Sequence, residues 1–285
     1  MKFRKSLKGS IMLLIAAEIW GFAFVAQSVG VDAIGNYTFT AVRNMIGGTV
    51  LIPVILFFRK KGEKLLTKEA VAGGICCGIF LFVATSLQQA GIVRTSVGKS
   101  GFLTALYVVL VPVVGSLVNR KTEGKVWISV IIAVVGMYFL CMDGRIEFDL
   151  GELLLILCAL GFTGHILVID HFTVLADGKV IACIQFFTTA LLASAASLLF
   201  EKTDPAAIPG AWQALLFAGI MSSGVAYTLQ IVYQKDVEPA AASLIMSLES
   251  VFSVLGGWLL LNQRLSLREV LGCVLMFAAI VIAQV

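Results

Sequence analysis

Charged residues are scarce in this sequence. Of its 285 residues only 13% are charged and 59% are hydrophobic, and the mean hydropathy is +1.00. Soluble domains carry roughly 25% charged residues. A soluble fold of this length cannot hide so much apolar surface, so lipid must be the solvent for much of the chain. The composition therefore excludes an ordinary soluble protein and predicts a multi-pass integral membrane protein, which we place in the plasma membrane.

The residues that support catalysis or metal binding are also rare. There are only two histidines, and the six cysteines all fall inside apolar runs rather than at converging positions in polar loops. The sequence contains no HExxH or GxSxG motif and no pair of mid-span aspartates in a GxGD setting. These absences argue against a disulfide framework, a metal site, a cofactor and an enzyme. An intramembrane enzyme, a channel-like protein and a membrane scaffold remain the alternatives to a carrier.

Long apolar runs follow one another along the whole chain. A bilayer core of about 30 Å requires about 20 helical residues, and backbone groups in lipid must be paired within the segment, which predicts helices. Ten candidate spans are separated by short polar breaks. They lie near 9–28, 37–58, 70–90, 97–118, 126–142, 151–169, 178–199, 212–234, 239–261 and 267–284.

Lysine and arginine predict the orientation of the chain. In the first half, the N-terminal tail and the loops near 59–68 and 120–125 carry most of the positive charge, whereas the opposite side carries only Arg94, Lys99 and Arg145. Because cytoplasmic loops are enriched in these residues, we expect a cytoplasmic N-terminus. An even number of spans then places the C-terminus on the same side.

The chain also resembles itself. A shift of 142 along the numbering places Trp20 on Phe162 and Arg43 on Gln185, and in the later spans a shift of 145 places Thr104 on Glu249 and Tyr107 on Phe252. With five helices in each half, the second copy must enter the membrane upside down. Inverted repeats characterise secondary transporters, in which substrate binds near the midplane between the halves.

Several stretches resemble a known family. WGFAFV in the first span, TAVRNM in the second and GFLTALYVVLVPVVGSL in the fourth are similar to one half of an EamA-type transporter of the drug/metabolite transporter superfamily. SLESVFSVLGGWLLLNQRLSLREVLGCVLMFAAIVIAQ resembles the last two spans of that family. The resemblance implies an all-α bundle of ten transmembrane helices in two inverted five-helix repeats, with a central cavity and alternating access. The repeats would occupy residues 1–145 and 146–285.

Two positions depart from the pattern of this family. Members often have Gly-Glu-Arg after the ninth span, where this chain has Asn262, Gln263 and Arg264. Many also have a proline after the glutamate of the ninth span, where this chain has Ser250. The resemblance therefore implies no ionic role for the loop glutamate here, and it leaves open whether the ninth helix bends.

Glu18 stands within the apolar first span, and Arg43 stands at similar depth in the second. A charged side chain at mid-bilayer costs roughly 2.5–3.5 kcal/mol on insertion scales, so it usually faces a cavity or a partner. The two spans are antiparallel and joined by a short loop, and we predict a Glu18–Arg43 pair that lines the cavity. A purely structural pair, or an arginine that extends to the interface while Glu18 is protonated, remains open.

Other polar residues at membrane depth are candidates for the cavity wall. Glu249 lies midway in the ninth span, His165 in the sixth, and the polar stripes of the third, fourth and eighth spans recur at helical spacing. Each stripe suits a wet cavity or ordinary hydrogen bonding between helices. The complete set of predicted cavity residues is Glu18, Trp20, Arg43, Gln88, Gln89, Thr104, Tyr107, His165, Gln185, Tyr227, Gln230 and Glu249.

Taken together, these features predict a secondary transporter of small metabolites, such as amino acids, related amphiphiles or drugs. Glu18, Glu249 and His165 are the candidates for proton coupling. The expected partners are a small-molecule substrate and the lipid bilayer, with no nucleic acid; association into a homo-oligomer is left open. Neither the substrate nor the direction of transport follows from the residues.

Overall fold

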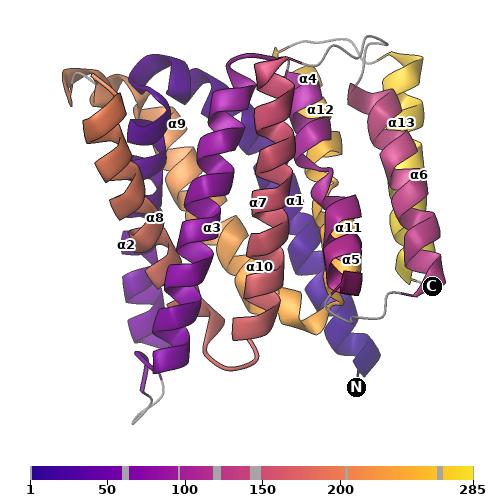
Figure 1. Ribbon diagram of the computed structural model, residues 1–285, viewed down its shortest axis with the longest axis horizontal. Helices are drawn as coiled ribbons and strands as arrows, with labels where there is room; N and C mark the ends of the chain where they lie inside the picture. The colour runs from indigo at the N-terminus through magenta and orange to yellow at the C-terminus, as the bar shows by residue number, and fades with distance from the viewer. Residues whose placement is uncertain are drawn as a thin grey trace.

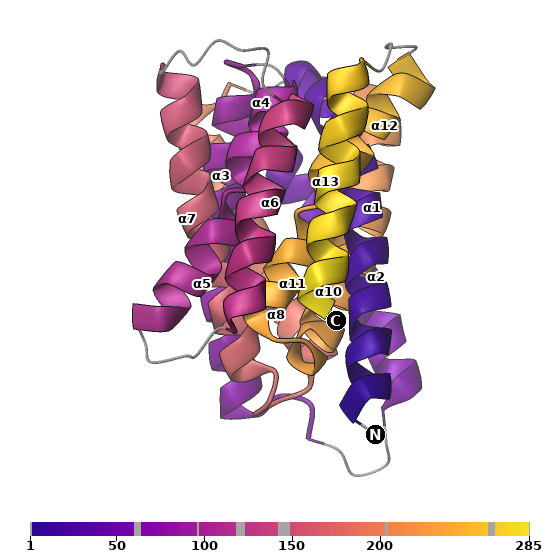
Figure 2. The ribbon, with the colours of Figure 1, turned by 90° about the vertical axis from the view of Figure 1, so that its right-hand side faces the viewer.

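The computed structural model describes residues 2–59, 64–95, 97–117, 123–141, 149–202, 205–261 and 266–284. Within these ranges the chain is helical and contains no strand. The helices form one upright bundle, and both chain termini lie toward its lower end in Figures 1 and 2. The boundary expected at 145/146, the loop residues 60–61, 120–121 and 145, and Asn262–Arg264 lie outside the described residues.

The first repeat contains six helices. They are α1 (Lys2–Ile34), α2 (Asn36–Phe58), α3 (Lys68–Ile92), α4 (Val97–Thr104), α5 (Tyr107–Leu117) and α6 (Gly124–Cys141). Gly35 has a φ of 84° between α1 and α2, a left-handed conformation that glycine adopts without steric cost. It allows the chain to reverse direction in a single residue.

The second repeat begins with α7 (Leu150–Phe172) and α8 (Gly178–Phe200). Its third segment is composite, with η1 (Pro205–Ala211), α9 (Trp212–Leu216), the π-helix η2 (Phe217–Tyr227), α10 (Thr228–Tyr233) and η3 (Gln234–Asp236). The chain continues as α11 (Pro239–Met246), α12 (Glu249–Leu261) and α13 (Leu267–Gln284).

Eight segments of the described residues are long and apolar enough to cross a membrane, and a further apolar helix, Gly124–Phe139, is shorter. Large apolar side chains cover the outside of the bundle: Phe57 is 83% exposed and Leu198 is 86% exposed. So much exposed hydrocarbon is typical of a surface solvated by lipid. The structure thus supports a multi-pass membrane protein, and the count of ten spans stays a prediction because α13 is not among the eight.

The two repeats run in opposite directions. In Figure 1, α4 lies above α5, whereas α11 lies below α12, so these two interrupted segments cross the bundle in opposite senses. The interruptions fall at Ala105–Leu106 and at Ser247–Leu248. The shift that relates Trp20 to Phe162 also relates one interruption to the other, so they are the same position in the two repeats. The ninth segment is interrupted although Ser250 replaces the family's proline.

Serine hydroxyls occupy backbone acceptors around the second interruption. The Ser247 hydroxyl donates to the carbonyl oxygen of Leu244 at 2.7 Å, and the Ser250 hydroxyl donates to that of Ser247 at 2.7 Å. A transmembrane helix can break only where other groups take over the freed backbone groups. These serines supply such groups locally, which explains how the break persists without a proline.

The repeats interlock through equivalent close helix crossings. α3 packs on α8, and η2 packs on α2. A Cβ added at Gly78 would lie 2.6 Å from Cβ of Thr188 and 2.8 Å from the carbonyl oxygen of Gln185. A Cβ added at Gly219 would lie 2.8 Å from Cβ of Ile46 and 3.1 Å from the carbonyl oxygen of Arg43. Glycine at both crossings lets the backbones approach closely, and the crossings position the backbones of Arg43 and Gln185.

The upper end of the bundle holds a further contact between the repeats. The carboxylate of Glu201, which follows α8, accepts hydrogen bonds from the backbone N–H groups of Tyr37 at 2.7 Å and Thr38 at 2.9 Å. A carboxylate at this position satisfies N–H groups that have no partner inside α2 and interacts favourably with the helix dipole.

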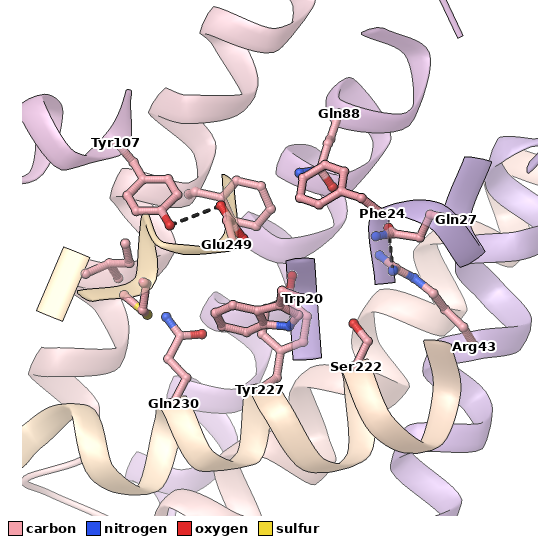
Figure 3. A pocket seen from close by; sticks show the side chains of 13 residues that line it. Trp20, Phe24, Gln27, Arg43, Gln88, Tyr107, Ser222, Tyr227, Gln230 and Glu249 are labelled. Atoms are coloured by element: carbon pink, nitrogen blue, oxygen red, sulfur yellow. Dashed lines mark hydrogen bonds between the residues drawn. The ribbon is translucent and has the colours of Figure 1, made fainter. Parts of the chain in front are cut away.

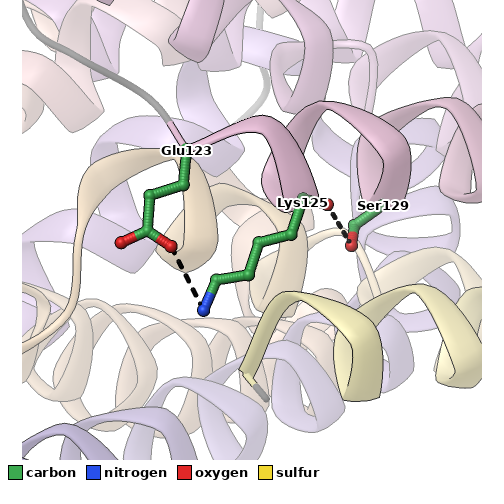
Figure 4. Close-up of polar contacts among 3 residues, drawn as sticks. All are labelled: Glu123, Lys125 and Ser129. Carbon is green, nitrogen blue, oxygen red and sulfur yellow. Dashed lines mark hydrogen bonds and ion pairs between the residues drawn. The ribbon is translucent and has the colours of Figure 1, made fainter.

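The lower end carries an exposed polar turn where α6 begins. Lys125 pairs with Glu123 at 3.1 Å, and the Ser129 hydroxyl donates to the carbonyl oxygen of Lys125 at 2.9 Å (Figure 4). Such exposed pairs contribute little to stability. Because α6 begins at the end of the bundle where the termini lie (Figure 1), Lys125 and the basic N-terminal tail are on one side, as the charge pattern predicts.

We predict that Gly78→Ala lowers the thermal unfolding midpoint of the detergent-purified protein. The added methyl group must displace Thr188 or the backbone of α8, and overpacking of this kind costs about 1–3 kcal/mol. Gly210→Ala is the matched control, because a Cβ there meets nothing within 4 Å. Equal midpoints for the two variants would contradict the close crossing.

Candidate functional site

A cavity with about 470 Å³ of empty space lies inside the bundle, where helices of both repeats meet (Figure 3). This volume includes the part of the space that is open to solvent. Aromatic rings, amides, one carboxyl group and one guanidinium group are among the groups that line the cavity. The lining residues are Trp20, Phe24, Gln27, Arg43, Gln88, Tyr107, Phe162, Ile166, Ser222, Tyr227, Gln230, Met246 and Glu249.

Eight of these residues form four pairs that obey the shift of 142 found in the sequence. Each pair contributes one side chain from each repeat, so this part of the cavity wall is built from equivalent positions of the two repeats. The pairs are Trp20 with Phe162, Phe24 with Ile166, Gln88 with Gln230, and Tyr107 with Glu249.

Tyr107 and Glu249 join the two helix interruptions. Each is the first residue of the helix after its break, and the Tyr107 hydroxyl donates to Oε1 of Glu249 at 3.1 Å. Both side chains are buried. The shift of 145 in the later spans, which pairs Glu249 with Thr104, is therefore wrong: the structural mate of Glu249 is Tyr107, at a shift of 142. Single matches between apolar helices do not distinguish registers one turn apart.

The basic side chain of the cavity lining is Arg43, which is only 2% exposed. Its Nη1 donates to Oε1 of Gln27 at 2.8 Å, and the same oxygen accepts a hydrogen bond from Nε2 of Gln89 at 2.6 Å. Gln27 therefore fixes the arginine to α3 and α1. The sequence reasoning missed this glutamine, although its position two helical turns after Trp20 places both on one helix face.

Glu18 does not reach this cavity. It is exposed and absent from the lining, and Arg43 bonds to Gln27 instead. The predicted Glu18–Arg43 pair is therefore wrong. Depth in the membrane was compatible with the pair, but each residue turns the helix by about 100°. This rotation separates Glu18 from the inward face that holds Trp20 and Phe24.

An aromatic wall forms on the side of Tyr227. Its ring lies 4.7 Å from Trp20 and 5.9 Å from His165, measured between ring centroids. His165 Nε2 and Gln185 Oε1 are 2.8 Å apart. Both side chains are fully buried and neither lines the cavity, so His165 and Gln185 support Tyr227 from behind.

Seven of the twelve predicted cavity residues line the cavity: Trp20, Arg43, Gln88, Tyr107, Tyr227, Gln230 and Glu249. Gln89, Thr104, His165 and Gln185 are buried behind it. Gln89 bonds to Gln27, and Thr104 accepts a hydrogen bond from Gln88 at 3.5 Å. The residues that the sequence reasoning missed are Phe24, Gln27, Phe162, Ile166, Ser222 and Met246. The shift of 142 indicates two of them, because it relates Trp20 to Phe162 and Phe24 to Ile166.

The π-helix η2 contributes Ser222 and Tyr227 to the cavity. π-helical turns are rare and frequently occur at functional sites. The corresponding residues of the first repeat, in α3, form a regular α-helix. Gly78 corresponds to Gly219 at the helix crossings, whereas Gln88 corresponds to Gln230 in the cavity. The interval from Gly219 to Gln230 is one residue longer than the interval from Gly78 to Gln88. The π-helix η2 accommodates this additional residue.

Comparison with known proteins agrees with this architecture. The sequence pattern of the EamA-like transporter family matches residues 7–142 and again residues 149–284. The chain belongs to the EamA-like transporter family. The starts of the two matches are separated by the same interval that relates the paired cavity residues. They establish the two-repeat EamA architecture from sequence, independently of the cavity.

Relatives with this architecture bear transporter names. An "Uncharacterized transporter" of Archaeoglobus fulgidus is 29% identical over 98% of this chain and 87% of its own length. The "Uncharacterized transporter YoaV" of Bacillus subtilis is 24% identical over 96% of both chains. A crystal structure aligns with this chain at a TM-score of 0.80 and 18% identity. The alignment covers 97% of this chain and 98% of the other, so the two share the same fold. The EamA family and these relatives point to a membrane transporter rather than an enzyme.

We predict that Tyr107→Phe lowers the free energy of unfolding by about 1–3 kcal/mol, because it removes the only hydrogen bond that the structure shows for the buried Glu249 side chain. The measurement is the thermal midpoint in detergent. Tyr138→Phe is the matched control, since Tyr138 is outside the cavity lining. A Tyr107→Phe variant as stable as this control would show that the hydrogen bond is not formed in solution.

Proposed function

We propose that this EamA protein is a secondary transporter that carries a small amphiphilic metabolite or drug across the plasma membrane by alternating access. Amino acids and related compounds are within this class. The observation that supports the proposal most strongly is the construction of the cavity from paired residues of two inverted repeats. If the two repeats exchange their conformations, the same binding residues face the opposite side of the membrane.

The cavity lining suits a substrate with both apolar and polar parts. Trp20, Phe24, Phe162 and Tyr227 offer ring surfaces, while Gln88 and Gln230 offer amide donors and acceptors. Oε1 of Gln230 has no hydrogen-bond partner although it is buried. Unsatisfied polar atoms in a lined cavity favour a ligand that supplies the missing partners.

The two interruptions are the natural points of movement. Helices broken at membrane depth commonly form substrate sites in transporters, and here the breaks are linked by Tyr107 and Glu249. Because this hydrogen bond joins the two repeats, we propose that it breaks and re-forms as one repeat moves against the other. A substrate or a proton bound at Glu249 would then be coupled to that motion.

The proposal is tested by transport into liposomes. A binding screen of amino acids, nucleosides, cationic drugs and sugars on detergent-purified protein supplies a substrate, whose saturable flux is then measured. We predict that Gln230→Trp abolishes this flux, because the indole fills the cavity, whereas Gln213→Trp on the exposed surface retains it. Both variants must elute as monodisperse protein. Equal flux in the two variants would contradict transport through this cavity, and ion currents far above carrier rates would indicate a channel.

Proton coupling is tested with two identical substitutions. We predict that Glu249→Gln removes the response of uptake to a pH gradient, because it removes the one carboxyl group among the described residues that line the cavity. Glu18→Gln makes the same change at an exposed position in the same membrane and leaves the response intact. If the wild type and both variants respond alike between pH 5 and 8, the carrier is not coupled to protons through Glu249.

A further inference from the structure

Arg43 is a buried cation without an acidic partner. The residue is 2% exposed, and among the described residues no carboxylate lies within ion-pair distance of its guanidinium. Nε of Arg43 has no hydrogen-bond partner at all. Arginine stays charged in proteins and carries five N–H donors in a planar fork. A buried charge that is not paired is costly, so the site is incomplete without an anion.

The neighbours of Arg43 solvate its charge without neutralising it. Gln27 provides one amide oxygen, which is shared with Gln89, and the ring of Phe39 lies 5.9 Å from the guanidinium carbon. Both groups are neutral. Glu249 lies on the opposite side of the cavity in Figure 3, where it accepts the hydrogen bond from Tyr107. Glu249 therefore does not neutralise Arg43, and the charge of Arg43 is available to a ligand.

A second donor without a partner faces the same cavity. Nε1 of Trp20 is buried, lines the cavity through its indole and makes no hydrogen bond. Figure 3 shows the indole nitrogen turned toward the side that holds Ser222 and Arg43. An indole N–H can only donate. Two unsatisfied N–H donors in one cavity, one of them cationic, match an anionic oxygen group.

The equivalent position in the second repeat is neutral. Gln185, the repeat mate of Arg43, is paired with His165 rather than with the cavity. Among the described residues that line the cavity, the guanidinium cation therefore lies on one side only. This asymmetry would orient a bound molecule in one direction.

We propose that Arg43, assisted by the indole N–H of Trp20, binds an anionic group of the transported substrate. This inference rests on the proposed function and deepens it, because it identifies the substrate as an organic anion with an apolar body. A carboxylate accepts two parallel hydrogen bonds from the guanidinium edge, a geometry that lysine cannot reproduce. A phosphonate shares this chemistry. The apolar body would lie against Phe24 and Tyr227.

The test compares matched probes on the detergent-purified full-length protein by isothermal titration calorimetry. The probes are 3-phenylpropionate, 2-phenylethylphosphonate and 3-phenylpropionamide, which differ mainly in the charge of the head group. For the wild type we expect at least tenfold tighter binding of an anionic probe than of the amide. Tighter binding of 3-phenylpropionate would indicate a carboxylate site, and tighter binding of 2-phenylethylphosphonate would indicate a phosphonate site.

The variants separate the charge of Arg43 from its shape. Arg43→Gln, which copies Gln185, is expected to weaken anion binding at least tenfold while amide binding changes less than twofold. Arg43→Lys retains the charge but not the planar fork, so its affinity for the anions should fall between those of the wild type and Arg43→Gln. Arg268→Gln is the control, because that guanidinium lies over the rings of Tyr138 and Phe139 and outside the cavity lining.

Equal binding of anions and amide by the wild type overturns the inference, and that comparison requires no variant to fold. Anion binding that survives in Arg43→Gln overturns it too, as does the absence of binding by both anions. The proposed function fails in a different way, through the absence of saturable flux for any compound in liposomes. Flux of neutral or cationic compounds without preference for anions would keep the transporter and remove the anion site.

Discussion

Lipid offers no hydrogen-bond partner to a peptide group, and this constraint governs the whole molecule. It makes every described span a helix and covers the outside of the bundle with apolar side chains. It also determines where irregular backbone is permitted. The breaks at Ala105–Leu106 and Ser247–Leu248 and the π-helix η2 all contain or adjoin residues that line the cavity. The irregular backbone at membrane depth therefore lies beside the cavity, although η2 also exposes apolar side chains such as Met221 on the outside of the bundle.

The same enclosure allows polar chemistry at membrane depth. Tyr107 and Glu249 satisfy each other across the repeats, and Gln27 holds the guanidinium of Arg43. These contacts lie at opposite sides of a cavity whose walls include four pairs of symmetry-related positions (Figure 3). The symmetry suits a carrier that presents one site to two sides of a membrane, while the unequal mates Arg43 and Gln185 give a bound molecule a preferred direction.

Much of the fold and part of the site could be predicted. The internal repeat already related Trp20 to Phe162 and Arg43 to Gln185. The polar stripes indicated Gln88 and Gln230 as cavity residues, and the position of Glu249 midway in an apolar span indicated that residue as well. The prediction was wrong for Glu18 because its depth was considered without its rotation about the helix. It also failed to separate lining residues from supporting ones, since His165 and Gln185 are as buried as Gln230.

The sequence by itself was sufficient for the membrane class, the helical segments and the repeat, and its resemblance to known transporters indicated the family. The length and composition of each apolar segment control its insertion into the membrane, and both can be read directly from the sequence. The tertiary structure alone decided which face of each helix turns inward, the register that joins Tyr107 to Glu249, and the separation of Arg43 from every acid that the structure describes. Helices that are apolar on every side carry no periodic signal for their inward face, so packing between residues far apart in the chain determines which polar groups meet.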